Sequence, residues 1–248
     1  MSSINLLYKK EYKINEHIGI YIPTVGEVLG VNPDGSATDG VEDNYYSIIY
    51  SLTAMPIDMM VFLDDANIDF SQINDYELFL ILFPGLKDMD TSLIFHGLDL
   101  KKFDYDENKE NKMVVLRNTE SGAVIDREIH AQIANTLRML HHLEKDKRKP
   151  ANKEAMDFMI ERARKKMKRS KNKKEPSNLE TLICAMVNTE QFKYKYEEVL
   201  NLSIYQFNES VKQIIKKVDY DNKMRGVYAG TISAKDLSQD DFNWLTHK

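Results

Sequence analysis

A basic segment of thirty residues divides the chain and limits how it can fold. Residues 145–174 contain 14 Lys and Arg against 4 Asp and Glu, a net charge of +10 in a chain of net charge −5, so the remainder carries −15. The stretch "KKMKRSKNKKEPS" (165–177) offers almost nothing to bury and is expected to be frayed or disordered. We therefore predict an N-terminal domain over 1–143, a basic helix and linker over 144–176, and a C-terminal helical module over 177–248.

The low number of turn-forming residues favours helix over a many-stranded architecture. The 248 residues include only 10 Gly and 6 Pro, and 42% are hydrophobic. The single cysteine, Cys184, lies in the apolar run "LETLICAMV" and is predicted to be a buried small hydrophobe. One cysteine excludes an internal disulfide framework. The predicted fold class is α+β and predominantly helical.

Nothing in the sequence predicts a membrane protein. The start, "MSSINLLYKKEYK", lacks the long apolar core of a signal peptide. The longest apolar run, "LFLILF" (78–83), is too short to span a bilayer. The expected location is the cytoplasm, without membrane contact.

Capping and turn patterns outline the N-terminal elements. Residues 4–22 alternate loosely and predict a β-hairpin. Thr24 with Glu27 predicts a capping box that opens a short helix, and Asn74 with Glu77 predicts another. The other expected elements are a loop at 32–40, helices starting near Asp43 and at Pro56, the end of the 74–83 helix at Pro84, and a β-meander within 91–125 that uses "SLIFHG", "KKFDY", "MVVLRN" and "AVID".

Further helices follow the meander. Residues 126–143 place apolar side chains at helical spacing, and Asn152 is a candidate cap for a helix with a methionine-rich stripe. Ser177 with Glu180 predicts a third capping box, and Ser203 with Gln206 predicts a fourth. The stripe of the last helix comprises Ile204, Phe207, Val211, Ile214, Ile215 and Val218, and "LETLICAMV" and "DDFNWL" are its expected cover. A polar break and a second short helical run are expected after this helix.

The sequence gives only weak indications of metal-binding or catalytic residues. Adjacent His141 and His142 point about 100° apart on a helix, and His130 lies about 16 Å from His141 along the axis. Solvated helix-end histidines are the favoured interpretation. The carboxylates Asp64, Asp65, Asp69, Asp104, Asp106 and Glu107 are interpreted as surface groups. Glu107 and Lys109 have the Glu-x-Lys spacing of a nuclease but fall in a predicted turn instead of on a strand, and residues 63–70 lack the glycine and terminal Glu of a calcium loop. No phosphate-binding or nucleophile motif is present, so we predict a non-enzymatic protein with no cofactor and no metal.

Judged from residue chemistry alone, the basic segment is the strongest indication of a binding function. Its cations suit phosphates, but no aromatic residue is interleaved between residues 159 and 176 to stack on bases. A solubilising linker is therefore favoured, and nucleic acid is disfavoured as a partner. The candidate contacts are Arg162, Lys165, Lys166, Lys168, Arg169, Lys173 and Lys174.

Four phrases carry a resemblance to a known class of proteins. They are "EHIGIYIPTVGEVLG", "YYSIIYSLTAMPIDMMVFLDD", "INDYELFLILFPGL" and "LSIYQFNESVKQI…YDNKMRGVYAGTISAKDLSQDDFNWL". The layout resembles tail-morphogenesis proteins of tailed phages and prophages of low-GC Gram-positive bacteria, among which tail assembly chaperones are the nearest functional class. The resemblance implies a helical, non-enzymatic protein that binds the tape measure protein until the tail tube polymerises around it.

The resemblance thus predicts a phage tail assembly chaperone in the host cytoplasm whose partner is the tape measure or tail tube protein, with self-association left open. One alternative is a structural virion component, such as a connector or baseplate protein, located in the virion. The other is a nucleic-acid-binding regulator that uses 162–174. The candidate partner-binding residues are Phe207, Val211, Ile214, Tyr220, Tyr228, Phe242 and Trp244.

Overall fold

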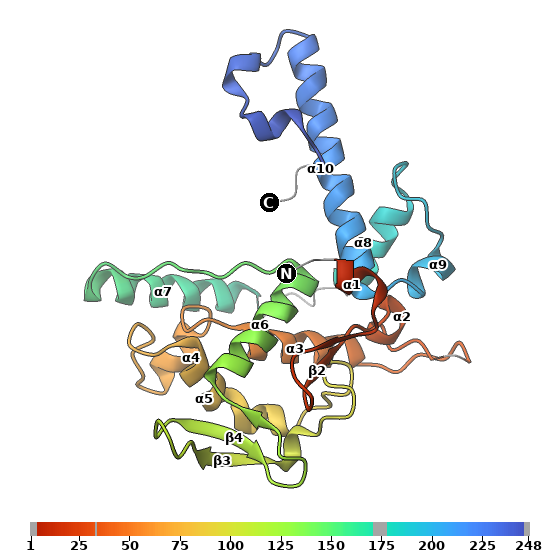
Figure 1. Cartoon of the computed structure of the whole chain (residues 1–248). Helices are drawn as coiled ribbons and strands as arrows, with labels where there is room; N and C mark the ends of the chain where they lie inside the picture. Colours follow the sequence, from red (N-terminus) through yellow and green to blue (C-terminus); the bar gives the residue numbers. More distant parts are fainter. Residues whose placement is uncertain (1–3, 33, 171–177, 246–248) are drawn as a thin grey trace.

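The computed structural model describes residues 4–32, 34–170 and 178–245 and has the predicted α+β, predominantly helical architecture (Figure 1). The helices are α1 Ile4–Tyr8, α2 Val25–Val28, α3 Val41–Thr53, α4 Met60–Asp65, α5 Asp75–Lys87, α6 Arg127–His141, α7 Lys153–Ser170, α8 Asn178–Val187, α9 Tyr196–Leu200 and α10 Ile204–Tyr228. The strands are β1 Glu11–Lys13, β2 Gly19–Tyr21, β3 Phe103–Glu107, β4 Val114–Asn118 and β5 Val124–Ile125. Short 3₁₀ helices lie at Leu100–Lys102, Ala234–Asp236 and Gln239–Phe242.

The start of the chain differs in part from the prediction. β1 and β2 form the expected antiparallel hairpin, but residues 4–8 are the helix α1 instead of its first strand. Leu6 of α1 is buried in the core, and the side-chain amide of Gln206 in α10 donates to the carbonyl oxygen of Leu7. A helix satisfies its own backbone groups while it places Leu6 against α10, which a strand without a neighbour would not do.

Two predicted capping boxes are confirmed here. The Thr24 hydroxyl accepts from the backbone N–H of Glu27, and the Glu27 carboxylate accepts from the N–H of Thr24 at 2.7 Å. The Asn74 and Glu77 pair does the same at the start of α5. Each box satisfies N–H groups that the first helical turn leaves without partners.

Helix α5 continues through Pro84 to Lys87, so the predicted end at Pro84 is wrong. Proline has no N–H and leaves the carbonyl oxygen of the residue four positions earlier, Leu80, without its helical donor. The hydroxyl of Tyr105 on β3 donates to that oxygen at 2.8 Å. The sheet therefore supplies the bond that the proline removes.

We expect Tyr105→Phe to lower the free energy of unfolding by about 1 kcal/mol. The substitution keeps the ring that meets Phe83 edge-on at 5.8 Å between centroids and removes only the donor to Leu80. Urea denaturation measures the change. Tyr8→Phe, at an exposed side chain, is the matched control and should stay within about 0.5 kcal/mol of the wild type. If both variants are equally stable, the Tyr105 bond does not support α5.

The β-meander is confirmed for three of its four predicted strands. β3, β4 and β5 form an antiparallel sheet, with Phe103 opposite Asn118 and Leu116 opposite Ile125. "SLIFHG" is a turn, because the backbone N–H groups of Ile94 and Phe95 both donate to the carbonyl oxygen of Thr91. The helix predicted at Pro56 also begins later, at Met60.

The main hydrophobic core joins the two sides of the basic segment. Phe79 and Phe83 of α5 lie in this core with α3, α6, the hairpin and α2. Val199 of α9 and Phe207 of α10, from beyond the basic segment, are fully buried in the same core. Residues before and after the basic segment therefore share one core. The domain boundaries remain a prediction.

A second, smaller core attaches α7. Ile160 is buried against Ala54, Ile57, Leu63, Phe70 and Leu78, and five methionines (Met55, Met59, Met60, Met156 and Met159) border this cluster. The guanidinium of Arg164 pairs with both Asp64 and Asp65 at the end of α4. The Asn152 side chain accepts from the N–H of Ala155 at 2.8 Å, which confirms the predicted cap.

The end of α7 is better ordered than predicted, since the helix continues to Ser170. The rest of "KKMKRSKNKKEPS" lies outside the described residues, as does Ser177 of the predicted third box. Within the described ranges, no helix combines the length and apolar character needed to cross a membrane.

Candidate functional site

The far part of α10 and the residues after it form the candidate partner-binding site. We call residues 212–245 the arm. α10 has 25 residues, and the Ser203 and Gln206 capping box that starts it is confirmed. Its first turns are buried between α2, α6 and α1, whereas its far end lies beyond every other labelled element (Figure 1).

The polar break expected within this region is wrong, because α10 is continuous to Tyr228. Ion pairs at helical spacing bridge the polar stretch. The ammonium of Lys217 lies 2.6 Å from the Asp221 carboxylate, and that of Lys223 lies 2.7 Å from Asp219. Pairs four residues apart stabilise a helix that has no core against which to pack.

Beyond α10 the chain turns and runs back along the helix. Gly230, in the left-handed conformation at φ 71°, follows the last turn of α10. Ile232 then folds over Gly226, so closely that a Cβ at position 226 would lie 2.5 Å from its Cδ1. A glycine inside a helix is unfavourable by about 1 kcal/mol relative to alanine. Glycine fits position 226 because any side chain there would collide with Ile232.

Charged and aromatic contacts hold the returning segment on α10. The Lys223 ammonium pairs with Asp241 at 2.7 Å, and that of Lys217 lies 5.8 Å from the centroid of the Trp244 ring. Hydrogen bonds from Lys223 and then from Ser238 lower the pKa of the Asp241 carboxyl to about 2. These contacts connect the returning segment to the helix and make the arm a folded element.

The predicted partner-binding residues divide into buried and accessible ones. Phe207 and Val211 are buried in the main core, which leaves them no surface for a partner. Ile214 packs partly against that core, and Tyr220 and Trp244 are half-buried. Tyr228 is 88% exposed and Phe242 is 46% exposed. Leu245 is 60% exposed and was not among the predicted residues. Ile215 is 61% exposed, although it was predicted to belong to the buried stripe.

The basic candidates lie along one helix. Arg162, Lys165, Lys166, Lys168 and Arg169 are exposed on α7, and Lys165 pairs with Glu161 at 2.6 Å. Lys173 and Lys174 lie outside the described residues. Arg164, which the sequence analysis did not single out, attaches the helix to α4 and is not available for a phosphate in this conformation.

Most of the candidate carboxylates pair with cations, whereas Asp69 accepts hydrogen bonds from the backbone N–H and the hydroxyl of Ser71. Asp64 and Asp65 bind Arg164, Asp104 lies 3.0 Å from the Lys87 ammonium, and Asp106 binds the Arg117 guanidinium at 2.5 Å. Among the described residues, no group of three or more His, Cys, Asp or Glu side chains is placed to hold a metal ion. Cys184 is exposed on α8, contrary to the prediction that it is buried.

Of the three candidate histidines, His130 is buried in the core, whereas His141 and His142 are half-buried at the end of α6. His130 is 2% exposed, and its ring stacks on Phe79 at 4.4 Å between centroids. Burial lowers the pKa of His130 to about 4. His141 lies 3.0 Å from the Tyr45 hydroxyl, and burial lowers its pKa to about 4 as well. Both therefore serve the core as neutral rings, an outcome that helical spacing alone did not reveal.

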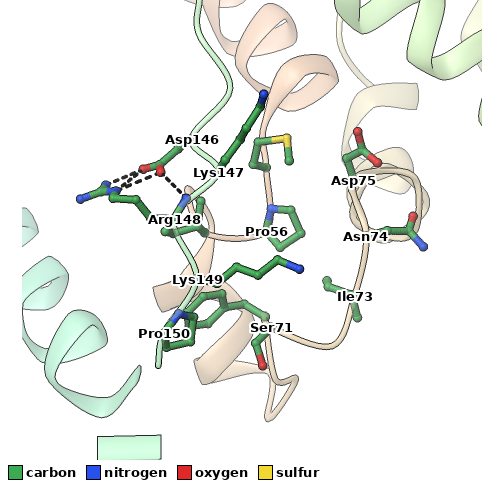
Figure 2. A pocket seen from close by; sticks show the side chains of 13 residues that line it. Pro56, Ser71, Ile73, Asn74, Asp75, Asp146, Lys147, Arg148, Lys149 and Pro150 are labelled. Carbon is green, nitrogen blue, oxygen red and sulfur yellow. Dashed lines mark hydrogen bonds and ion pairs between the residues drawn. The ribbon is translucent and has the colours of Figure 1, made fainter. Parts of the chain in front are cut away.

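A pocket of about 420 Å³ lies beside the second core (Figure 2). Its apolar side comes from Ile57, Phe70 and Ile73, and segment 146–150 forms the opposite side. Arg138 of α6 contacts the residues next to this pocket. Its buried guanidinium donates to the carbonyl oxygen of Thr53 and lies 3.6 Å from the Met55 sulfur.

One comparison with known proteins gives a match. Residues 170–248 match the family model described as the YomV second domain, a prophage-derived family. This match relates the last part of the chain to a phage-derived family. The matched region, about the last third of the chain, contains α8, α9, α10 and the whole arm. No curated protein and no solved structure matches the chain.

Proposed function

We propose that the protein is a non-enzymatic phage morphogenesis factor that binds another phage protein through its arm. The supporting observation is the exposure of Ile215, Tyr228, Phe242 and Leu245 on an element that projects from the body and is itself firmly folded. Tyrosine and other large apolar side chains carry much of the binding energy in protein interfaces. A preorganised arm loses little conformational entropy when it binds.

Within that class we propose a tail assembly chaperone, and the tape measure protein as its partner. A long helical partner offers extended apolar stripes, and the arm offers separated apolar side chains near both ends of its projecting part. The phage-derived family model that covers the arm supports a phage partner. In the structural alternative, a connector or baseplate component, the protein would be found in purified virions, where a chaperone would be absent.

Replacing Tyr228 and Phe242 together with serine is expected to weaken partner binding by about tenfold to a hundredfold without unfolding the protein. Both side chains are exposed, so their loss leaves the core intact. The measurement is the yield of infectious particles when each variant complements a phage that lacks the gene.

Tyr8→Ser is the matched control, because Tyr8 is an exposed tyrosine outside the arm. This variant should complement as the wild type does. Full complementation by the Tyr228 and Phe242 variant would overturn the proposal.

A further inference from the structure

The pocket beside the second core has the size and lining of a small-molecule site. Its volume of about 420 Å³ falls in the range of roughly 300–1,000 Å³ that is usual for such sites. Phe70, Ile57 and Ile73 provide apolar surface, and two prolines, Pro56 and Pro150, add to it. The side chains of this wall have no hydrogen-bonding groups, so the wall suits the hydrocarbon or aromatic part of a ligand.

The charges around this pocket do not cancel. Its two carboxylates have cationic partners: Asp146 binds the Arg148 guanidinium, and Asp75 lies 3.7 Å from the Lys145 ammonium. Among the described residues, neither Lys147 nor Lys149 has an ion pair. Figure 2 shows the Lys149 side chain extended across the pocket toward Ile73. The Lys147 side chain extends away from Ile73, so an anion in the pocket would meet the Lys149 ammonium group (Figure 2).

The segment that carries both lysines is attached loosely. In the described part of the chain, the backbone of residues 144–151 forms no backbone–backbone hydrogen bond. It is tied by α6 at one end, by α7 at the other, and by the Lys145 and Asp75 pair between them. Such a segment can adjust its distance from the apolar wall at small cost, which gives a ligand access.

We propose that this pocket binds a small amphipathic carboxylate. The apolar body lies against Phe70, Ile57 and Ile73, and the carboxylate pairs with the ammonium group of Lys149, while Lys147 adds a second positive charge at the rim of the pocket. This site lies on the body, whereas the proposed partner surface lies on the arm, so either proposal can fail without the other.

Titration with decanoate below its micelle concentration tests the site, with the ¹³C-methyl signals of Ile57 and Ile73 as the readout and that of Ile20, in the main core, as the internal reference. We expect saturable shifts at Ile57 and Ile73 only. Each buried methylene should strengthen binding about fourfold, so octanoate, which is two methylenes shorter, should bind about fifteenfold more weakly than decanoate. Decanol, which has the same chain without the charge, should also bind about tenfold more weakly.

The double variant Lys147→Gln and Lys149→Gln should reduce decanoate affinity about tenfold while leaving decanol affinity unchanged. Lys166→Gln with Lys168→Gln removes the same charge from the exposed face of α7 and is the matched control, which should bind as the wild type does. The proposal is overturned by any of three results: no saturable shift at Ile57 and Ile73, equal affinity for decanoate and decanol, or unchanged decanoate affinity in the Lys147 and Lys149 variant.

Discussion

Phe207→Ala is expected to lower the free energy of unfolding by about 3–5 kcal/mol. The Phe207 side chain is fully buried and meets the Phe192 ring edge-on at 6.1 Å between centroids. Truncation leaves a cavity that the surrounding helices cannot close, because α10 is bonded on both sides. The N–H of Ile204 donates to the carbonyl oxygen of Pro23 at 2.8 Å, and the Asn208 amide donates to that of Leu140 at 3.0 Å.

The elements that are destabilised by Phe207→Ala are as informative as the size of the stability loss. Because the main core spans both sides of the basic segment, destabilisation at Phe207 should also speed amide hydrogen exchange in α2 and α6. Exchange measured by mass spectrometry on wild type and variant tests this. Tyr228→Ala, on the arm, should leave exchange in α2 and α6 unchanged. If Phe207→Ala affects only residues after 177, the C-terminal region folds as an independent module.

The second large effect is a loss of stability in acid that arises at His130. Its pKa is about 4 in the folded chain, against an ordinary value of 6.5. Below pH 6.5 the unfolded chain takes up a proton that the folded chain does not, so the contribution of the neutral ring to stability is complete above that pH and declines as the pH falls. At pH 4 the loss should reach about 3 kcal/mol.

Urea denaturation of wild type and His130→Leu at pH 7 and pH 4 isolates this contribution. Leucine cannot take up a proton, so the variant should lose about 3 kcal/mol less than the wild type between the two pH values. Carboxylates and the other histidines titrate in both proteins and cancel in the comparison. If both proteins lose stability equally, His130 does not control the acid response.

Local signals in the sequence predicted local structure well. The capping boxes at Thr24, Asn74 and Ser203 each need only residues three positions apart, and all three are confirmed. The strands of the meander followed from short apolar runs between turns. These features depend on neighbouring residues alone, so no knowledge of the fold was required.

Predictions failed where a distant residue decides the outcome. Helix α5 passes Pro84 because Tyr105, which is distant in sequence, donates to the Leu80 carbonyl oxygen. His130 was interpreted as solvated because helical spacing does not show that Phe79 of another helix stacks on it. Tertiary contacts of this kind override local preference, and one sequence does not contain them explicitly.

For the candidate site, the sequence predicted a region but did not show which of its side chains are accessible. The stripe from Ile204 to Val218 reads as one apolar face, yet Phe207 is buried while Ile215 is exposed. The difference arises where α10 leaves the body: the near part is covered by α2 and α6, and the far part is not. No periodicity marks that point. The pocket beside the second core also escaped prediction, because three segments distant in sequence form it.

Photo-crosslinking from the arm during phage assembly tests the proposed function most directly. A photoreactive amino acid in place of Tyr228 should form a crosslink to the tape measure protein of the same phage, identified by mass spectrometry. The same amino acid in place of Tyr8, exposed on the body, should form none. Absence of that crosslink from position 228, or an equal crosslink from both positions, would contradict partner binding by the arm.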